Sequence, residues 1–574
     1  MADIVERYPA GSSTANYTGN DLTDVQTHSG AATGDVIKVS QNITVSTTIG
    51  NGATSGYSVG SFTLQGASSE NPVTISGGTR LYNLPNTVTE FTLKDVTISG
   101  FVNNDASGGA IRVNGPITIN LENVTFKNNK ENKHHGGGIS RDNTSDLVTI
   151  VGDNLTFDGN YAKYGGGAIR SRLEISGKNK KSVITFNNNS SGYNGAIVTL
   201  GSSDDMASVF STGTFYFTNN TGLEGGAIFA VRSLTFSGDT TAYFQNNKVS
   251  RNGNDIYLES RNSSKLTFKD AGNYSFDGGI YLANANQKTI IDKAQVTIAG
   301  RENDTTNNYV LRSVTISNGG KLTANLTEIN SLSGTFNVGK DESSNSSTGT
   351  LELHVSEKTK SLTVSDSLKI FSTDKGVIIK TGEGTLKIDA AKNAVDVYSL
   401  VVSSGRLDMK EYFKGQLEVK SGAEFSPGNS VGSLEIGEGT YGGGLILNED
   451  GAKLLMEIGG ENTIQNDSLI VNGNILIGND SIIELTLADN SQLKGGDTFT
   501  AILYGSNSGE DGFKENLLSH ISSYYFTNLD YIPYGAGYAI TGALDPNAVP
   551  EPSTWALLLL GAAGLMYWRK RTRK

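Results

Sequence analysis

Four successive stretches of the chain decide its fold: FKNNKENKHHGGGI at 126–139, FDGNYAKYGGGAI at 157–169, FNNNSSGYNGAI at 186–197 and FTNNTGLEGGAI at 217–228. Each stretch begins with Phe-x-x-Asn and ends with a glycine-containing turn followed by isoleucine. The isoleucines of successive copies are 28 to 31 residues apart. A unit of this length cannot bury its own apolar face, so it gains stability by stacking on its neighbours.

Six copies of both motifs occur in phase along the chain. The first motif is formed by Phe101 and Asn104, Phe126 and Asn129, Phe157 and Asn160, Phe186 and Asn189, Phe217 and Asn220, and Phe244 and Asn247. The second motif includes Gly108 to Ile111, Gly137 to Ile139, Gly166 and Gly167 with Ile169, Gly195 to Ile197, Gly225 and Gly226 with Ile228, and a degenerate copy from Gly253 to Ile256.

Elementary packing explains both motifs. Strands stacked at roughly 4.8 Å place phenylalanine on phenylalanine inside the column. We expect the asparagine to lie at a corner, where it adopts left-handed backbone and bonds to the asparagine of the next coil. The glycine pair supplies positive φ and close backbone approach at another corner. The repeats therefore predict an all-β protein, a single-stranded right-handed parallel β-helix (solenoid).

Composition agrees with many short strands joined by tight turns. The 574 residues include 70 Gly, against a usual share of about 7%, with 23 Tyr, 21 Phe and only 9 Pro. The absence of Cys excludes disulfides and thiolate sites. The net charge of −12 repels phosphate backbones and disfavours nucleic-acid binding.

The chain ends in VPEPSTWALLLLGAAGLMYWRKRTRK, residues 549–574. The apolar run from Trp555 to Trp568 makes a helix of roughly 21 Å, shorter than the ~30 Å hydrocarbon core of a bilayer. Interfacial tryptophans and long basic side chains extend such a span. We expect a short hydrophobic membrane helix with its basic end in the cytoplasm and the body of the protein on the far side.

This tail resembles the PEP-CTERM sorting signal. Its three parts are Pro550, Glu551 and Pro552, then the apolar segment with Gly561 and Gly564, then the basic stop of Arg569, Lys570 and Arg571. The resemblance implies an exosortase-type membrane peptidase as partner, a transient membrane anchor, and a location in a Gram-negative cell envelope or extracellular matrix. No secretion signal is visible in residues 1–20, so either the start has been trimmed or mis-assigned, which we favour, or export uses another route.

The paired repeats, over roughly residues 95–260, resemble those of the polymorphic outer-membrane protein family, which are surface β-helices that include adhesins. Ser426 to Gly432 resemble a late segment of autotransporter passengers. Five regions are expected: an N-terminal cap with the first coils at 1–94, repeat coils at 95–300, passenger-like coils at 301–505, a C-terminal cap and linker at 506–548 with one short helix within 513–525, and the sorting signal at 549–574.

Candidate catalytic and metal-binding residues are few. Asp204 and Asp205 are the one adjacent acidic pair of the repeat region, and we interpret them as a solvated loop. His134 and His135 are adjacent and would point to opposite faces of a strand, so we expect a solvated turn there and no metal. No cofactor motif is present, and the chain is predicted not to be an enzyme.

Three functions remain open. The leading hypothesis is an adhesin-like surface or matrix protein whose polar face binds a glycan or another surface ligand through many weak contacts. The alternative is a polysaccharide-active lyase or hydrolase, because such enzymes share this scaffold. The third is an inert structural component of an extracellular matrix.

Overall fold

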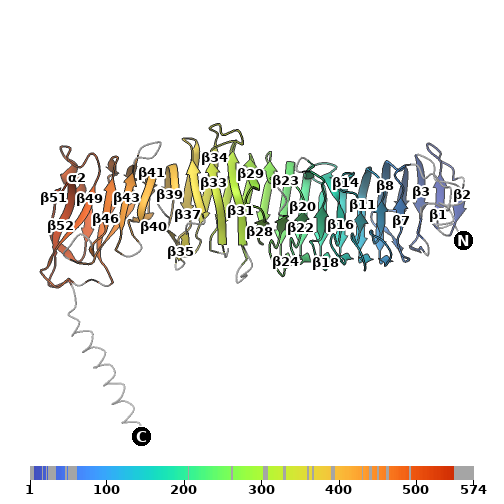
Figure 1. Cartoon of the computed structure of the whole chain (residues 1–574), viewed down its shortest axis with the longest axis horizontal. Coiled ribbons are helices and arrows are strands. Elements are labelled where there is room, and N and C mark those ends of the chain that lie inside the picture. Colours follow the sequence, from blue (N-terminus) through green and yellow to red (C-terminus); the bar gives the residue numbers. More distant parts are fainter. Residues whose placement is uncertain are drawn as a thin grey trace, which may run out of the picture. The chain divides into compact units, whose positions relative to one another are not determined.

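A computed structural model of the chain describes residues 5–15, 17–20, 22, 34–45, 48–49, 61–203, 206–259, 263–301, 308–327, 331–358, 361–364, 368–389, 395–428, 431–437, 443–448, 451–460, 465–489, 491 and 493–548. The chain divides into two compact units. Unit 1 comprises Met1–His354 and Ser367–Gly376, and unit 2 comprises Val355–Asp366 and Val377–Lys574. Both are all-β and built mainly from parallel strands (Figure 1). The region boundaries expected from the sequence stay predictions.

Each coil of the repeat region contributes strands to several parallel sheets of unit 1. Sheet 1 contains, in order of pairing, β3 (Asp35–Val39), β5 (Phe62–Gly66), β8 (Glu90–Ser99), β11 (Ile117–Lys127), β14 (Leu147–Asp158), β16 (Ile169–Gly177), β20 (Ser208–Thr218), β23 (Leu234–Gln245), β26 (Lys265–Lys269), β29 (Lys288–Asp292), β31 (Asn308–Ser317), β33 (Ser331–Val338) and β36 (Leu368–Ser372).

The second halves of the long strands form sheet 2. It contains β4 (Ile43–Thr44), β6 (Val73–Ser76), the C-terminal parts of β8, β11 and β14, β17 (Val183–Asn187), the C-terminal parts of β20 and β23, β27 (Asn273–Phe276), β30 (Gln295–Ile298), β32 (Gly320–Asn325) and β34 (Gly349–His354).

Short strands after the glycine corners form sheet 3, and a fourth, six-stranded corner sheet lies within the first Phe-x-x-Asn motif and directly after the other five. Sheet 3 contains β7 (Tyr82–Leu84), β10 (Ile111–Val113), β13 (Ile139–Ser140), the start of β16, β19 (Ile197–Thr199), β22 (Ile228–Ala230), β25 (Ile256–Leu258) and β28 (Ile280–Leu282). The corner sheet contains β9 (Val102–Asn103), β12 (Lys130–Glu131), β15 (Tyr161–Ala162), β18 (Ser190–Ser191), β21 (Thr221–Gly222) and β24 (Lys248–Val249).

The long strands β8, β11 and β14 pass from sheet 1 to sheet 2 through a bend at one left-handed residue. Asp95, Asn123 and Asn154 hold φ of 54°, 53° and 52° at equivalent positions. Their side chains form a short ladder, because Asn154 Nδ2 donates to Asn123 Oδ1 at 2.7 Å and Asn123 Nδ2 donates to Asp95 Oδ1 at 3.0 Å. Asn and Asp tolerate this backbone better than other residues with a side chain.

Unit 1 begins with an antiparallel arrangement. Strand β1 (Val5–Tyr8) pairs antiparallel with β2 (Tyr17–Gly19) and with β3. The buried ion pair between Arg7 and Asp35 joins β1 to β3 at 2.5 Å. These strands cover the first edge of the parallel stack, which would otherwise expose unpaired backbone groups.

Unit 2 repeats the stacked design with a different strand order. One seven-stranded sheet contains β35 (Ser361–Val364), β38 (Thr385–Ile388), β40 (Arg406–Met409), β42 (Glu424–Ser426), β45 (Lys453–Ile458), β48 (Ile482–Leu487) and β50 (Ile521–Ser523). The other parallel strands are β37 (Gly376–Thr381), β39 (Val395–Val402), β41 (Glu411–Val419), β43 (Ser433–Gly437), β44 (Gly444–Leu447), β46 (Ser468–Val471), β47 (Ile475–Ile477) and β49 (Thr498–Tyr504).

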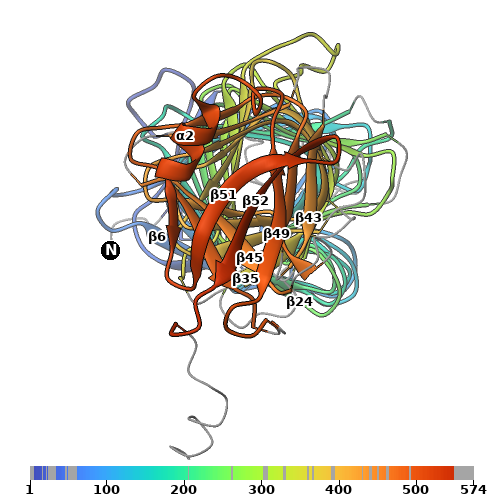
Figure 2. The ribbon, with the colours of Figure 1, turned by 90° about the vertical axis from the view of Figure 1, so that its left-hand side faces the viewer.

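An antiparallel cap closes unit 2. Strand β52 (Gly537–Leu544) pairs antiparallel with β49 and with β51 (Phe526–Tyr534), and the helix α2 (Phe513–Ser519) lies beside them (Figure 2). The expected helix within 513–525 is therefore correct only for its first seven residues, since Ile521–Ser523 form a strand. Phe513 and Leu517 are the buried side of α2, and Phe513 lies 5.9 Å from the Tyr531 ring.

Candidate functional site

The sorting residues lie outside the described part of the chain. This holds for Pro550, Glu551 and Pro552, for Trp555, Gly561, Gly564 and Trp568, and for Arg569, Lys570 and Arg571. The acidic pair Asp204 and Asp205 also lies outside it. Among the helices of the described residues, none has the length and apolar character needed to cross a membrane.

The repeat phenylalanines form one continuous stack inside unit 1. The ring centroids of Phe126, Phe157, Phe186 and Phe217 are separated by 4.8, 5.1 and 5.2 Å, with interplanar angles of 5° to 7°. Phe217 to Phe244 is 4.4 Å. All these rings are fully buried. The spacing equals that of neighbouring strands, so each ring fills the gap above the ring of the previous coil.

The repeat asparagines form a buried ladder beside this stack. The ladder consists of five side chains with an exposed fraction of 0%, those of Asn129, Asn160, Asn189, Asn220 and Asn247. At each step Oδ1 of one asparagine accepts the backbone N–H and the Nδ2–H of the asparagine before it. For Asn129 and Asn160 both distances are 3.0 Å. The second Nδ2–H of Asn160 donates to Phe126 O at 2.9 Å.

Two expectations about this motif were wrong. The left-handed residue is the one before the asparagine, as at Asn128, Gly159 and Asn188, with φ of 54°, 66° and 53°. The asparagine itself is free to point inward because its neighbour makes the turn. The first copy is also out of register, since Phe126 pairs with Ile98 and not with Phe101. Phe101 instead occupies the ladder position, where its N–H donates to Asn129 Oδ1 at 3.1 Å.

The glycine corners have the two roles expected of them. Gly166 and Gly225 hold φ of 71° and 60°. A Cβ at Gly167 would lie 2.3 Å from Ser190 O, and one at Gly226 would lie 2.5 Å from Asn254 O. The isoleucines that follow pair in register on successive coils, in the order Ile111, Ile139, Ile169, Ile197, Ile228 and Ile256.

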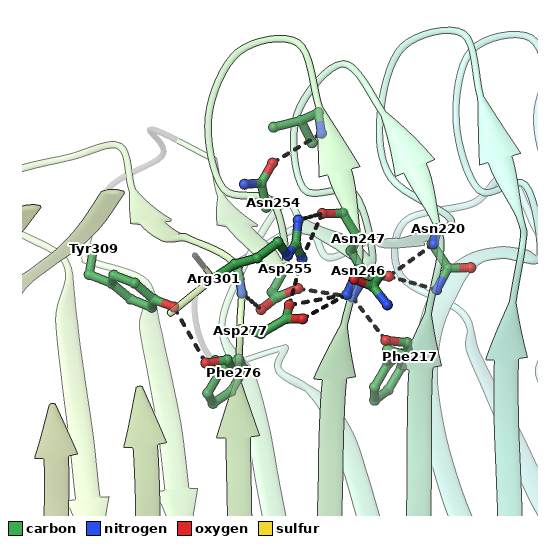
Figure 3. A network of polar contacts seen from close by, with 12 residues as sticks. Phe217, Asn220, Asn246, Asn247, Asn254, Asp255, Phe276, Asp277, Arg301 and Tyr309 are labelled. Atoms are coloured by element: carbon green, nitrogen blue, oxygen red, sulfur yellow. Dashed lines mark hydrogen bonds and ion pairs between the residues drawn. The ribbon is translucent and has the colours of Figure 1, made fainter. Parts of the chain in front are cut away.

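The asparagine ladder ends at an aspartate. The coil after Asn247 has glycine at the equivalent position, and Asp255 reaches across from the degenerate glycine corner (Figure 3). Asn247 Nδ2 donates to Asp255 Oδ1 at 2.9 Å, and Gly278 N donates to Asp255 Oδ2 at 2.8 Å. The other copies have Ala or Gly where Asp255 stands. The aspartate in place of Ala or Gly is visible in the sequence. Its role at the end of the asparagine ladder becomes clear only from the structure.

A charged pair lies next to this end of the ladder. Arg301 bonds to Asp277 at 2.6 Å, and Asp277 also accepts the N–H of Asn246 (Figure 3). Asp255 is wholly buried, and loss of hydration together with the nearby Asp277 charge raises its pKa to about 7. The hydrogen bonds from Asn247 and Gly278, and the Arg301 charge, oppose this rise.

The histidine pair lies at a glycine corner that is less solvated than expected. Burial lowers the pKa of His135 to about 4, so the ring is neutral at pH 7. His135 lies 5.7 Å from the Tyr164 ring. His134 donates its backbone N–H to Glu131 Oε1 at 2.9 Å. Within the described residues no group of three His, Cys, Asp or Glu could hold a metal ion.

Unit 2 contains another buried aspartate with a raised pKa, Asp467, that sequence reasoning missed. Asp467 accepts the N–H of Gly432 at 2.7 Å and that of Glu457 at 2.8 Å. It thereby joins Gly432 to β45. Burial raises the pKa of Asp467 to about 7. No local pattern marks this residue, because its two partners lie 35 and 10 positions away.

Two protein-family models match parts of this chain. Residues 548–571 match the PEP-CTERM protein-sorting motif, and residues 154–172 match the Chlamydia polymorphic membrane protein repeat. The second match contains Phe157, Asn160 and Ile169, which belong to the phenylalanine stack, the asparagine ladder and the isoleucine row.

One relative is the probable outer membrane protein pmp6 of Chlamydia pneumoniae, 26% identical over 158 residues. The match covers 27% of this chain and 12% of the relative, so the chain spans about an eighth of that protein's length. The sorting motif implies processing by an exosortase-type sorting system. This chain therefore carries a PEP-CTERM sorting motif and polymorphic-membrane-protein-like repeats, and its location is the cell envelope or outer-membrane surface.

Proposed function

We propose that the protein is an adhesin-like component of the cell surface or extracellular matrix, built as a right-handed, single-stranded β-helix and without enzymatic activity. The match of residues 548–571 to a sorting motif is the observation that carries this proposal. A stack stabilised by neighbouring coils suits such a role, because every added coil extends the surface without a new core.

The tail acts in two steps in this proposal. The apolar segment from Trp555 to Trp568 first holds the protein in the membrane as a short helix, with Arg569 to Arg571 on the cytoplasmic side. An exosortase-type peptidase then cuts near Pro550, Glu551 and Pro552 and releases the body to the surface. The body gains adhesion through many weak polar contacts that act together.

The experiment replaces Pro550, Glu551 and Pro552 by alanine in the native host. We expect unprocessed protein of higher mass in the membrane fraction and a loss of surface protein accessible to external protease. The matched control replaces Lys180 and Lys181, two exposed residues of a turn in unit 1, by alanine. Normal mass and normal surface exposure of the motif variant would refute the sorting role.

A separate assay addresses catalysis. Purified protein is incubated with a panel of polysaccharides, and reducing ends and unsaturated products are measured. We expect no turnover. Turnover that is lost after Asp204→Ala or Asp205→Ala would contradict the non-enzymatic assignment and favour the polysaccharide-active alternative.

A further inference from the structure

A shallow groove of about 290 Å³ lies on the outer surface of unit 1, over strands β31, β33 and β36. Its lining includes Arg312 and Lys369 together with the hydroxyl groups of Ser313, Ser333 and Thr335, and none of the lining residues is acidic. The charged side chains of the lining are therefore both cationic, although the chain has a net charge of −12.

An irregularity in the strands creates the groove. The pairing of β31 with β33 shifts between Val310 and Arg312, and Arg312 adopts a left-handed φ of 62°. Opposite it stands Gly334, where a Cβ would lie 2.6 Å from Arg312 O. The missing side chain leaves the recess open. A left-handed arginine costs free energy, and such conformations concentrate at binding and active sites.

The Arg312 side chain is held in one orientation. Its Nε donates to Leu282 O at 2.8 Å and its Nη2 donates to Ala283 O at 3.2 Å. These carbonyl bonds position the guanidinium without neutralising its charge. The cation therefore remains available to an anionic group, and little side-chain entropy is lost when a ligand binds.

Lys369 of the groove lies in register with a second lysine, Lys288, which stands beside the groove and not in its lining. Lys288 pairs with Ser313, Ser313 with Thr335, and Thr335 with Lys369 on four neighbouring strands. Three strand steps of roughly 4.8 Å place the two lysines about 14 Å apart along the stack. Both lysines are exposed, and within the described residues neither forms an ion pair. The row thus presents spaced positive charge with hydroxyl groups between.

We propose that this groove binds an acidic polysaccharide of the uronate type, laid across successive coils. Carboxylates of the polymer pair with Arg312, Lys288 and Lys369, and its hydroxyl groups bond to Ser313 and Thr335. Widely spaced positive charges suit a polyuronate better than a nucleic acid, because a duplex carries one negative charge per ~1.7 Å. The net negative charge of the protein also repels a nucleic acid. The lining contains no aromatic ring on which a base could stack. The inference rests on the proposed surface function, because the polymer is met outside the cell.

The test measures binding of the purified full chain to polygalacturonate by biolayer interferometry at 50 and 300 mM NaCl. We expect affinity to fall at least tenfold in the variant Arg312→Gly/Lys369→Gln, with a weaker salt dependence. Glycine suits the left-handed backbone at 312, so the variant keeps the strand irregularity. Lys369→Arg should retain binding. Lys127→Gln, on an exposed position of sheet 2, is the matched control and should bind like the parent.

Three results would overturn the proposal: equal affinity of the double variant and the parent, equal affinity for a neutral glucan, or equal affinity for polyglutamate, which would indicate general polyanion binding. A circular dichroism spectrum identical to that of the parent shows that the variant is folded. The sorting experiment measures the mass and the surface exposure of the protein, and neither depends on a polysaccharide ligand. Failure of polyuronate binding with normal sorting would thus reject this inference alone, whereas failure of sorting would reject the proposed function.

Discussion

Replacing Asn160 by alanine tests the asparagine ladder directly. The amide group of Asn160 makes four hydrogen bonds, two as donor to Phe126 O and Asn189 Oδ1 and two as acceptor from Asn129 N and Nδ2. Alanine removes all four in a site from which water is excluded. Some partners keep a second bond, since Asn129 Nδ2 still donates to Ile98 O and Asn189 Oδ1 still accepts the Asn160 N–H.

The magnitude follows from the groups that lose their partner. Asn129 N–H is left without an acceptor, which costs about 1–3 kcal/mol, and three further buried hydrogen bonds are lost at about 0.5–1.5 kcal/mol each. The expected loss in free energy of unfolding is about 4 kcal/mol. The control is Asn132→Ala, whose exposed side chain bonds to Asn104 Oδ1. An exposed substitution of this kind changes stability by roughly 0.5 kcal/mol.

Two measurements check this expectation. Urea unfolding followed by far-ultraviolet circular dichroism gives the global loss, and native-state hydrogen exchange gives the local protection of the Asn129 amide. A loss of about 4 kcal/mol corresponds to protection weaker by roughly a thousandfold. If Asn160→Ala and Asn132→Ala were equally stable, or if protection at Asn129 were unchanged, the ladder would not stabilise the stack and the reasoning would fail.

Three more predictions follow from the same coils. Gly167→Ala should destabilise unit 1 severely, because its Cβ would lie 2.3 Å from Ser190 O, and soluble yield with urea unfolding measures this. Phe157→Ala should cost about 3–5 kcal/mol in urea unfolding by opening a cavity between two stacked rings. Burial raises the pKa of Asp255 from 3.8 to about 7. The contribution of Asp255 to the free energy of unfolding is therefore fully present below about pH 4. It is lost as the pH rises to about 7, and the loss is at most about 4 kcal/mol. The difference in melting temperature between the parent and Asp255→Asn should change over this pH window, and a constant difference would contradict the assignment.

The sequence was sufficient for the repeat because each of its parts has a local cause. The glycine corners need residues without a side chain, and the phenylalanines recur at the length of one coil. Stacking of Phe157 on Phe126 and bonding of Asn160 to Asn189 both follow once equivalent residues are placed one strand apart. The same logic predicted parallel sheets without any knowledge of their number.

Register and turns were predicted less well, because they depend on contacts between coils. The spacing suggested that Phe101 begins the first Phe-x-x-Asn motif, yet pairing of β8 with β11 places Ile98 opposite Phe126. The turn residue also differs, since Asn128 takes the left-handed backbone and leaves Asn129 inside. Both assignments depend on which residue faces the core, and neighbouring positions in a Phe-Val-Asn-Asn segment look alike in the sequence.

By itself, the sequence determined the repeat length, the residue types at the corners and the sorting tail, because each is written in consecutive residues. Only the tertiary structure decided that Asp255 ends the ladder, that Asp467 joins Gly432 to Glu457, and that Arg312 and Lys369 line one groove. These residues are brought together by coils stacked at strand spacing. Their electrostatic and hydrogen-bonding roles therefore arise from distances in space that no pattern along the chain records.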